Sequence, residues 1–207
     1  MSVRVQHGNE PTLYYVTFTC FNWLPSFSIT NGFDLIYNWF DYLKNNSSIK
    51  VTAYTIMPNH VHVILFFPAP NYSLNAIISN AKRFVAYKLI NRLKQLNENK
   101  ILQQLADGVT EREKKKGQLH KVFKDSFDAK PIYTRKFLLQ KINYIHLNPV
   151  KGKWKLISDW REYEHSSASV YELNKVVIMS FCIMMNCIRR LLCISDTPGS
   201  IANTQFY

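Results

Sequence analysis

The chain has 207 residues, of which 47% are hydrophobic, and includes 13 Phe and 12 Tyr. This length fits one domain, or one domain with an appendage, and the apolar content excludes an intrinsically disordered chain. Lys and Arg number 26 against 14 Asp and Glu, and the resulting charge of +12 favours an anionic partner such as nucleic acid or an acidic membrane surface.

The first part of the chain is predicted to contain three strands and a helix. Residues 12–23, TLYYVTFTCFNW, are rich in β-branched and aromatic residues and are typical of a strand. Residues 31–46 carry apolar side chains at a helical period. Residues 49–57 and 60–67 are predicted to be strands of an antiparallel hairpin that turns at Pro58.

A long helix is predicted next, from its N-cap at Ser73 to about Leu96. Residues 98–118 are polar and charged, which is typical of a solvated helix end and loop. The apolar stripe of the long helix is expected to be buried and comprises Leu74, Ile77, Ile78, Ala81, Phe84, Val85, Leu89, Leu93 and Leu96.

The last predicted elements are a strand at 120–127 and a helix at 134–150. Thr134 would cap this helix, and Pro149 would stop it because proline disfavours helical backbone at the residue before it. The order of elements predicts an α+β fold, with one antiparallel sheet and helices packed on one face, similar to the ferredoxin-like plan.

The character of the sequence changes after Asn174, so we assign residues 1–174 to the domain and 175–207 to an atypical tail. Its apolar part, 176–194, is interrupted by Asn186, Arg189 and Arg190 and falls short of the roughly 20 residues that a membrane span needs. We expect this tail to be peripheral rather than a membrane anchor and to contribute little to the core. The first ten residues lack the apolar core of a signal peptide, so the cytoplasm is the expected location.

Two histidines, His60 and His62, interrupt the apolar run IMPNHVHVILFF. Side chains alternate along a strand, so both imidazoles share one face while Val61, Val63 and Leu65 face the helices. The imidazoles, about 7 Å apart at the backbone, can converge on one metal ion from the more open face. The alternative is a pair of surface histidines on a hairpin.

The predicted helix at 134–150 supplies a tyrosine and a carboxamide. Tyr144 and Asn148 are four residues apart, which places them on one helical face. The apolar residues of this helix occupy another side: Phe137, Leu138, Ile142 and Ile145. Without further information, a half-buried structural tyrosine is the alternative reading of Tyr144.

The segments MPNHVHVI, NYIHLNPVKGKW and YEHSSA together resemble the single-tyrosine HUH transposases, and in particular their REP-associated tyrosine transposase branch. The resemblance covers roughly residues 10–172. It implies that His60 and His62 are metal ligands, that Tyr144 is the nucleophile and that Asn148 is the third metal ligand. It also implies an HUH endonuclease fold that uses Mg²⁺ or Mn²⁺ and no small-molecule cofactor, and either a monomer or a homodimer.

The activity implied is cleavage and rejoining of single-stranded or hairpin DNA through a 5′-phosphotyrosine intermediate. A phenol is a poor nucleophile without help, and a divalent ion polarises the scissile phosphodiester. Two other classes stay open: a non-catalytic single-strand nucleic-acid binder, and a metallohydrolase that uses water. Basic side chains expected to track the phosphates are Lys82, Arg83, Lys121, Lys124, Arg135 and Lys141.

Overall fold

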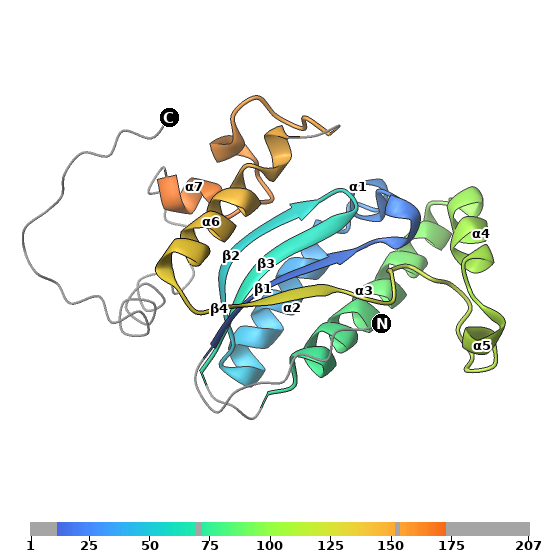
Figure 1. The fold of residues 1–207 in the computed structure, drawn as a ribbon. Helices are drawn as coiled ribbons and strands as arrows, with labels where there is room; N and C mark the ends of the chain where they lie inside the picture. The colour runs from blue at the N-terminus through green and yellow to red at the C-terminus, as the bar shows by residue number, and fades with distance from the viewer. Residues whose placement is uncertain (1–11, 69–71, 152–153, 173–207) are drawn as a thin grey trace, which may run out of the picture.

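The computed structural model describes residues 12–68, 72–151 and 154–172, and the expected tail at 175–207 lies outside them. The elements of the sheet and its principal helices follow one another along the chain (Figure 1). They are β1 (Thr12–Thr19), α1 (Ser26–Ile29), α2 (Phe33–Ser47), β2 (Lys50–Met57), β3 (His60–Phe67), α3 (Leu74–Gln95), β4 (Asp128–Ile132), α6 (Arg135–His146) and α7 (Ala168–Glu172). The remaining elements are η1 (Phe21–Trp23), α4 (Asn99–Asp107), α5 (Glu111–Lys114), η2 (Asn148–Val150) and η3 (Trp160–Glu162).

The described strands form one four-stranded antiparallel sheet in the order β2-β3-β1-β4. β1 and β3 lie at its centre, which agrees with their content of β-branched and aromatic residues. The predicted neighbours 12–23, 49–57 and 60–67 are therefore adjacent, and the α+β antiparallel class is confirmed. The pairing sets Thr17 opposite His62 and Thr19 opposite His60.

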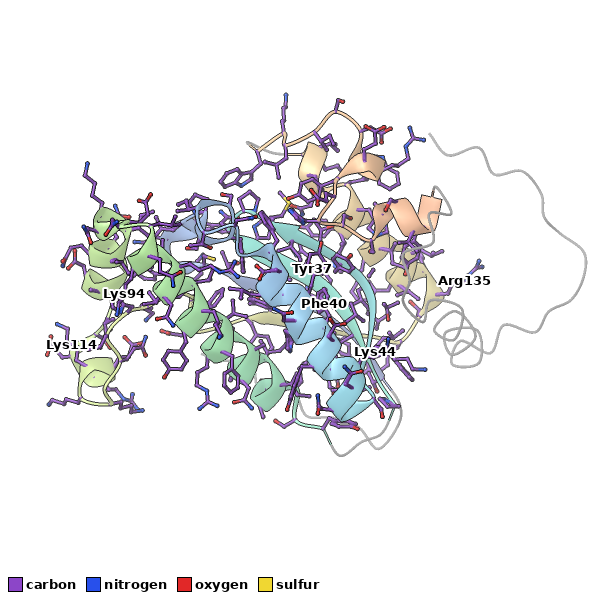
Figure 2. All side chains as sticks on the ribbon, turned by 180° about the vertical axis from the view of Figure 1, so that it is seen from behind. Tyr37, Phe40, Lys44, Lys94, Lys114 and Arg135 are labelled. Carbon is purple, nitrogen blue, oxygen red and sulfur yellow. The ribbon has the colours of Figure 1, made fainter. Side chains whose placement is uncertain are left out.

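One face of the sheet is covered by α2 and α3, which run side by side across it (Figure 2). Alternate residues of β3 point to this side and join the main core, as predicted: Val61, Val63 and Leu65. The helices contribute apolar side chains at a helical period, including Ile36, Phe40 and Leu43 from α2 and Leu74, Ile78, Ala81, Val85, Leu89 and Leu93 from α3. Ser73 caps α3 by accepting from the Ala76 N–H, again as predicted.

The opposite face of the sheet is covered by α6, so the expectation of helices on one face holds only for α2 and α3 (Figure 1). A second, smaller core forms there because the other set of alternate strand residues is also apolar. It contains Leu13, Tyr15, Ala53, Ile64, Phe66 and Ile132 of the strands with Leu138, Ile142 and Ile145 of α6. His60 and His62 point to this same face, where His62 contacts Tyr15 and Tyr144.

Three local predictions were wrong. The strand expected at 120–127 forms only an isolated bridge, between Phe123 and Cys20, and the fourth strand is β4. β4 is a short edge strand whose exposed Asp128 and Lys130 alternate with less exposed positions. The predicted buried stripe of α3 is narrower than expected, because Phe84 and Leu96 are 61% and 53% exposed. Part of the charged segment 98–118 is helical, in α4 and α5.

The helix predicted at 134–150 is capped by Thr134, which accepts from the Phe137 N–H, but it ends at His146. The chain then continues into the short η2 helix, which contains Pro149. Asn148 therefore does not share an α-helical face with Tyr144. Proline restricts the backbone of the residue before it, and this accounts for the early end of α6.

Candidate active site

His60 and His62 lie on the α6 side of β3 and are buried, with exposed fractions of 7% and 4%. The more open face predicted for them is thus largely covered by neighbouring side chains. The two Nε2 atoms are 3.1 Å apart, and the ring centroids are 4.7 Å apart. The strand alternation predicted from the sequence brings the imidazoles together in this way.

Asn59 fixes the tautomer of His60. Its Nδ2 donates to the carbonyl of Trp23 at 3.0 Å, so its Oδ1 faces His60 Nδ1 at 2.6 Å. A carboxamide oxygen only accepts hydrogen bonds, so Nδ1 of His60 must carry the proton. In the neutral ring the lone pair is then on Nε2, the atom that faces His62.

Thr17 and Tyr15 fix the tautomer of His62. Thr17 Oγ1 lies 2.7 Å from His62 Nδ1 and donates its own proton to the Tyr15 hydroxyl at 2.9 Å. Its lone pairs can therefore accept from Nδ1–H. The Tyr15 hydroxyl is also 2.9 Å from Nδ1, and its ring stacks on that of His62. Contacts of this kind from the residues behind them orient metal-binding histidines in proteins.

Burial keeps both imidazoles neutral. Desolvation lowers the pKa of His60 to about 4, an effect only partly offset by its hydrogen bond with Asn148. Desolvation also lowers the pKa of His62 well below its usual range, and the nearby His60 and Lys141 act in the same direction. A neutral imidazole is the form that binds a metal ion.

Asn148 and Tyr144 complete the group from the side of α6. Asn148 Nδ2 lies 3.1 Å from His62 Nε2, although the residue belongs to η2 and not to the helix. The ring of Tyr144 packs edge-on against that of His62 at 5.3 Å and against Tyr15 at 6.2 Å. Tyr144 is 47% exposed, so its phenol can be reached from solvent.

The side chains of His60, His62 and Asn148 fit a divalent cation. Two cis ligands of an octahedral ion at about 2.1–2.2 Å are about 3.0–3.1 Å apart, and the two Nε2 atoms are separated by 3.1 Å. A carboxamide can present either its nitrogen, as here, or its oxygen, which binds cations. No third His, Cys, Asp or Glu joins the pair within the described ranges.

Lys141 is a basic residue in contact with this group. Its ammonium lies over the rings of Tyr15, at 4.7 Å, and Tyr144, at 5.4 Å. Desolvation, with a smaller effect of Lys130, lowers the pKa of Lys141. A positive charge next to the phenol and close enough to lower the pKa of His62 is well placed to attract a phosphate.

The other basic candidates occupy different surroundings. Lys82 donates to the carbonyls of Lys124 and Asp125, and desolvation lowers its pKa to about 8. Lys121 is buried and paired with Glu113 and Asp125; these bonds raise its pKa although burial alone lowers it.

Three candidates remain more accessible. Arg83 is exposed on α3, on the far face of the sheet, and lies over the ring of Phe84. Arg135 projects into solvent at the start of α6 (Figure 2). Lys124 lies over the ring of Trp23, at 4.2 Å.

Sequence reasoning missed Asn59, Thr17, Tyr15 and Trp23 as parts of the site. The adjacency of Asn59 to the first histidine was a signal, because a strand that begins at His60 brings the preceding turn residue beside it. Thr17 and Tyr15 belong to a strand whose register with β3 the sequence does not specify. Nothing in the local sequence marked Trp23.

Comparisons with known proteins show similarity to transposases. The model of a family described as "Transposase IS200 like" matches residues 33–106, which include both histidines but neither Tyr144 nor Asn148. No curated protein matches the chain. Among the described residues, no helix is long and apolar enough to cross a membrane.

Two solved structures are similar. One is described as a REP-associated tyrosine transposase bound to a REP hairpin; it is 13% identical, with 84% of this chain and 86% of that chain covered and a TM-score of 0.58. The other is a putative transposase from Deinococcus radiodurans; it is 14% identical, with 65% and 88% covered and a TM-score of 0.40. The first likeness shows a shared fold. The chain thus matches the IS200-like transposases over residues 33–106 and has the fold of a REP-associated tyrosine transposase, which confirms the family resemblance predicted from its sequence.

Proposed function

We propose that this protein cleaves and rejoins single-stranded or hairpin DNA, using Tyr144 as nucleophile and Mg²⁺ or Mn²⁺ held by His60, His62 and Asn148. The observation that carries the proposal is the pair of Nε2 atoms that face each other at 3.1 Å, next to an exposed phenol. The hairpin-bound relative supports DNA as the substrate.

The cation, when bound, would polarise the scissile phosphate and neutralise charge that builds on its oxygens. The bond to phosphorus would be made by a residue of the chain. The Tyr144 oxygen forms a bond to phosphorus while the bond to the 3′ oxygen of the upstream nucleotide breaks. The phenol loses its proton to solvent and the leaving oxygen gains one, so the products are a 5′-phosphotyrosine and a free 3′-hydroxyl. A later 3′-hydroxyl reverses the step without ATP.

The order of side chains favours this step. Tyr144 contacts His62, so an attacking oxygen and a cation would reach the same phosphate. Lys141 adds positive charge on the side of the phenol. Asn59 and Thr17 keep the imidazole lone pairs directed toward the cation position before it is filled.

The test is a covalent adduct. The protein is incubated with a pool of random-sequence single-stranded oligonucleotides and Mn²⁺ or Mg²⁺, denatured in detergent, and examined for DNA that remains attached. We expect an adduct with the unaltered protein and none with Tyr144→Phe. Tyr133 is a second exposed tyrosine, 75% exposed, and lies between β4 and α6. Tyr133→Phe is therefore the matched control and should retain the adduct.

Variants of the ligands separate the rival functions. His60→Ala or His62→Ala should abolish most adduct formation, Asn148→Ala should reduce it less because water can occupy that position, and His120→Ala should leave it unchanged. Cleavage without any adduct would favour a hydrolase that uses water. DNA binding without cleavage would favour a non-catalytic single-strand binder.

A further inference from the structure

Trp23 is an exposed aromatic residue at the edge of the buried site. Its side chain is 49% exposed, and its ring lies edge-on to that of His60 at 5.9 Å. Its backbone is strained: Asn22 and Trp23 have φ values of 49° and 58°, in the left-handed region that residues with a Cβ rarely adopt. Burial in the core does not explain why a large apolar ring adopts such a conformation next to solvent.

The strained turn is held in place from two sides. Asn59 donates to the Trp23 carbonyl with the same carboxamide that orients His60, so the turn and the histidine are linked through one buried side chain. The Phe21 N–H donates to the carbonyl of Val122, and the Lys124 N–H donates to that of Thr19. The position of the Trp23 ring relative to His60 is therefore fixed by the fold.

The positions of Trp23 and Tyr144 along the strands place them at opposite ends of the histidine pair. Tyr144 contacts His62 and also Tyr15, which pairs with Ile64, further along β3. Trp23 follows the other end of β1, beyond the residue that pairs with His60. The order along the sheet is Tyr144, His62, His60, Trp23.

We infer that Trp23 is a stacking platform for the nucleobase immediately upstream of the cleaved phosphodiester, on the fragment that leaves with a 3′-hydroxyl. This inference rests on the function proposed above. In-line displacement puts the attacking oxygen and the leaving oxygen on opposite sides of the phosphorus. Tyr144 attacks from the His62 side, so the leaving nucleotide extends past His60 and reaches Trp23.

Lys124 suits this role as the partner of Trp23. Its ammonium lies 4.2 Å from the ring centroid, a contact that an arriving base can displace at little cost because the lysine is partly exposed. The displaced ammonium is then next to the phosphate backbone of the bound strand. Lys82, which donates to the Lys124 carbonyl, anchors the segment that presents it.

The first experiment detects the contact without requiring cleavage. The Tyr144→Phe protein is irradiated with random-sequence single-stranded DNA that contains 5-iodouracil, and the cross-linked peptides are identified by mass spectrometry. We expect Trp23 among the cross-linked residues. Its absence would overturn the inference. If Trp23 cross-links but the unaltered protein forms no adduct, the proposed cleavage fails while the stacking contact stands.

The second experiment identifies which base is stacked. A sequence recovered from the adduct pool is synthesised intact, with an abasic residue just upstream of the cut, and with one just downstream. Binding is measured by fluorescence anisotropy in the Tyr144→Phe background. Trp23→Ala should weaken binding of the intact strand by roughly 5- to 150-fold, the range of one base–aromatic stack, and Trp23→Phe by less.

The strand with the upstream abasic residue has no base to stack on Trp23. It should therefore bind Trp23→Ala and the protein that retains Trp23 equally well. The downstream abasic strand should still show the full effect. Phe84→Ala is the matched control, since Phe84 is 61% exposed with Arg83 over its ring but lies on the far face of the sheet. An equal effect of Trp23→Ala on all three strands, or coupling to the downstream position alone, would refute the assignment.

Discussion

Replacing Asn59 by alanine tests the buried support of the site, because one carboxamide serves two groups. The residue is fully buried, and the substitution leaves the Nδ1–H of His60 and the carbonyl of Trp23 without their partners. A buried polar group that loses its partner costs about 1–3 kcal/mol. Because the bond to the Trp23 carbonyl is only part-buried, we expect Asn59→Ala to lower the free energy of unfolding by about 2–4 kcal/mol, less than the loss of two fully buried partners would cost.

Urea denaturation measures this loss. With a slope of about 2 kcal/mol per molar urea, the unfolding midpoint should fall by about 1–2 M. Asn46→Ala is the matched control: Asn46 also donates to a backbone carbonyl, that of Tyr42, but from the surface of α2. Its effect should stay within about 0.5 kcal/mol.

Asn59→Asp separates the two hydrogen bonds. A carboxylate still accepts from Nδ1–H of His60 but cannot donate to the Trp23 carbonyl. In the adduct assay, Asn59→Ala should raise the Mn²⁺ concentration needed for half-maximal rate by about 10–100-fold, and Asn59→Asp should raise it much less. If Asn59→Ala unfolds at the same urea concentration as the unaltered protein and keeps its Mn²⁺ dependence, the tautomer argument is wrong.

Three further predictions concern other parts of the molecule. Lys141→Met should slow adduct formation roughly 10–100-fold, less than the loss of a donor in direct contact with the reacting group, and single-turnover rates would show whether it does. Burial lowers the pKa of His165, so its folded pKa lies below the unfolded value of 6.5; the unfolded state then binds more protons, and stability should fall as pH drops through about 6.5. His165→Phe keeps the ring stack on Phe33 and should make the curve less steep there, without flattening it, because His60 and His62 also bind protons on unfolding in this range; urea unfolding at several pH values would test this. Burial raises the pKa of the Cys20 thiol to about 12, so Cys20 should resist alkylation in the folded protein and react on unfolding, as peptide mapping by mass spectrometry would reveal.

Sequence patterns predicted three of the four strands because β1, β2 and β3 are long runs of β-branched and aromatic residues. They did not predict β4, whose five residues, DAKPI, include an aspartate, a lysine and a proline. An edge strand can carry such residues because one side of its backbone is not paired within the sheet. Local composition therefore identifies long strands rich in β-branched and aromatic residues, β2 at the other edge included, better than a short polar edge strand.

The pair of histidines could be predicted from strand alternation alone, since a spacing of two places both on one face. The side that α6 covers could not be predicted, because the apolar residues of a helix indicate that it packs and not on which face. The roles of Thr17 and Tyr15 depend on the register between β1 and β3, two strands that are far apart in sequence. Charge also proved ambiguous: the sequence does not reveal that Lys121 is paired with Glu113 and Asp125.

The two parts of the site have different structural origins. Pairing of β1 with β3 and the turn at Asn59 fix the histidines and their tautomers, so this part is as rigid as the centre of the sheet. Tyr144 and Asn148 arrive on α6 and η2, which reach the sheet through the small second core. Movement of α6 would displace the proposed nucleophile and the third ligand together and leave the histidine pair intact. Such a division would suit the proposed reaction, in which one strand end is exchanged for another while the proposed cation site stays in place.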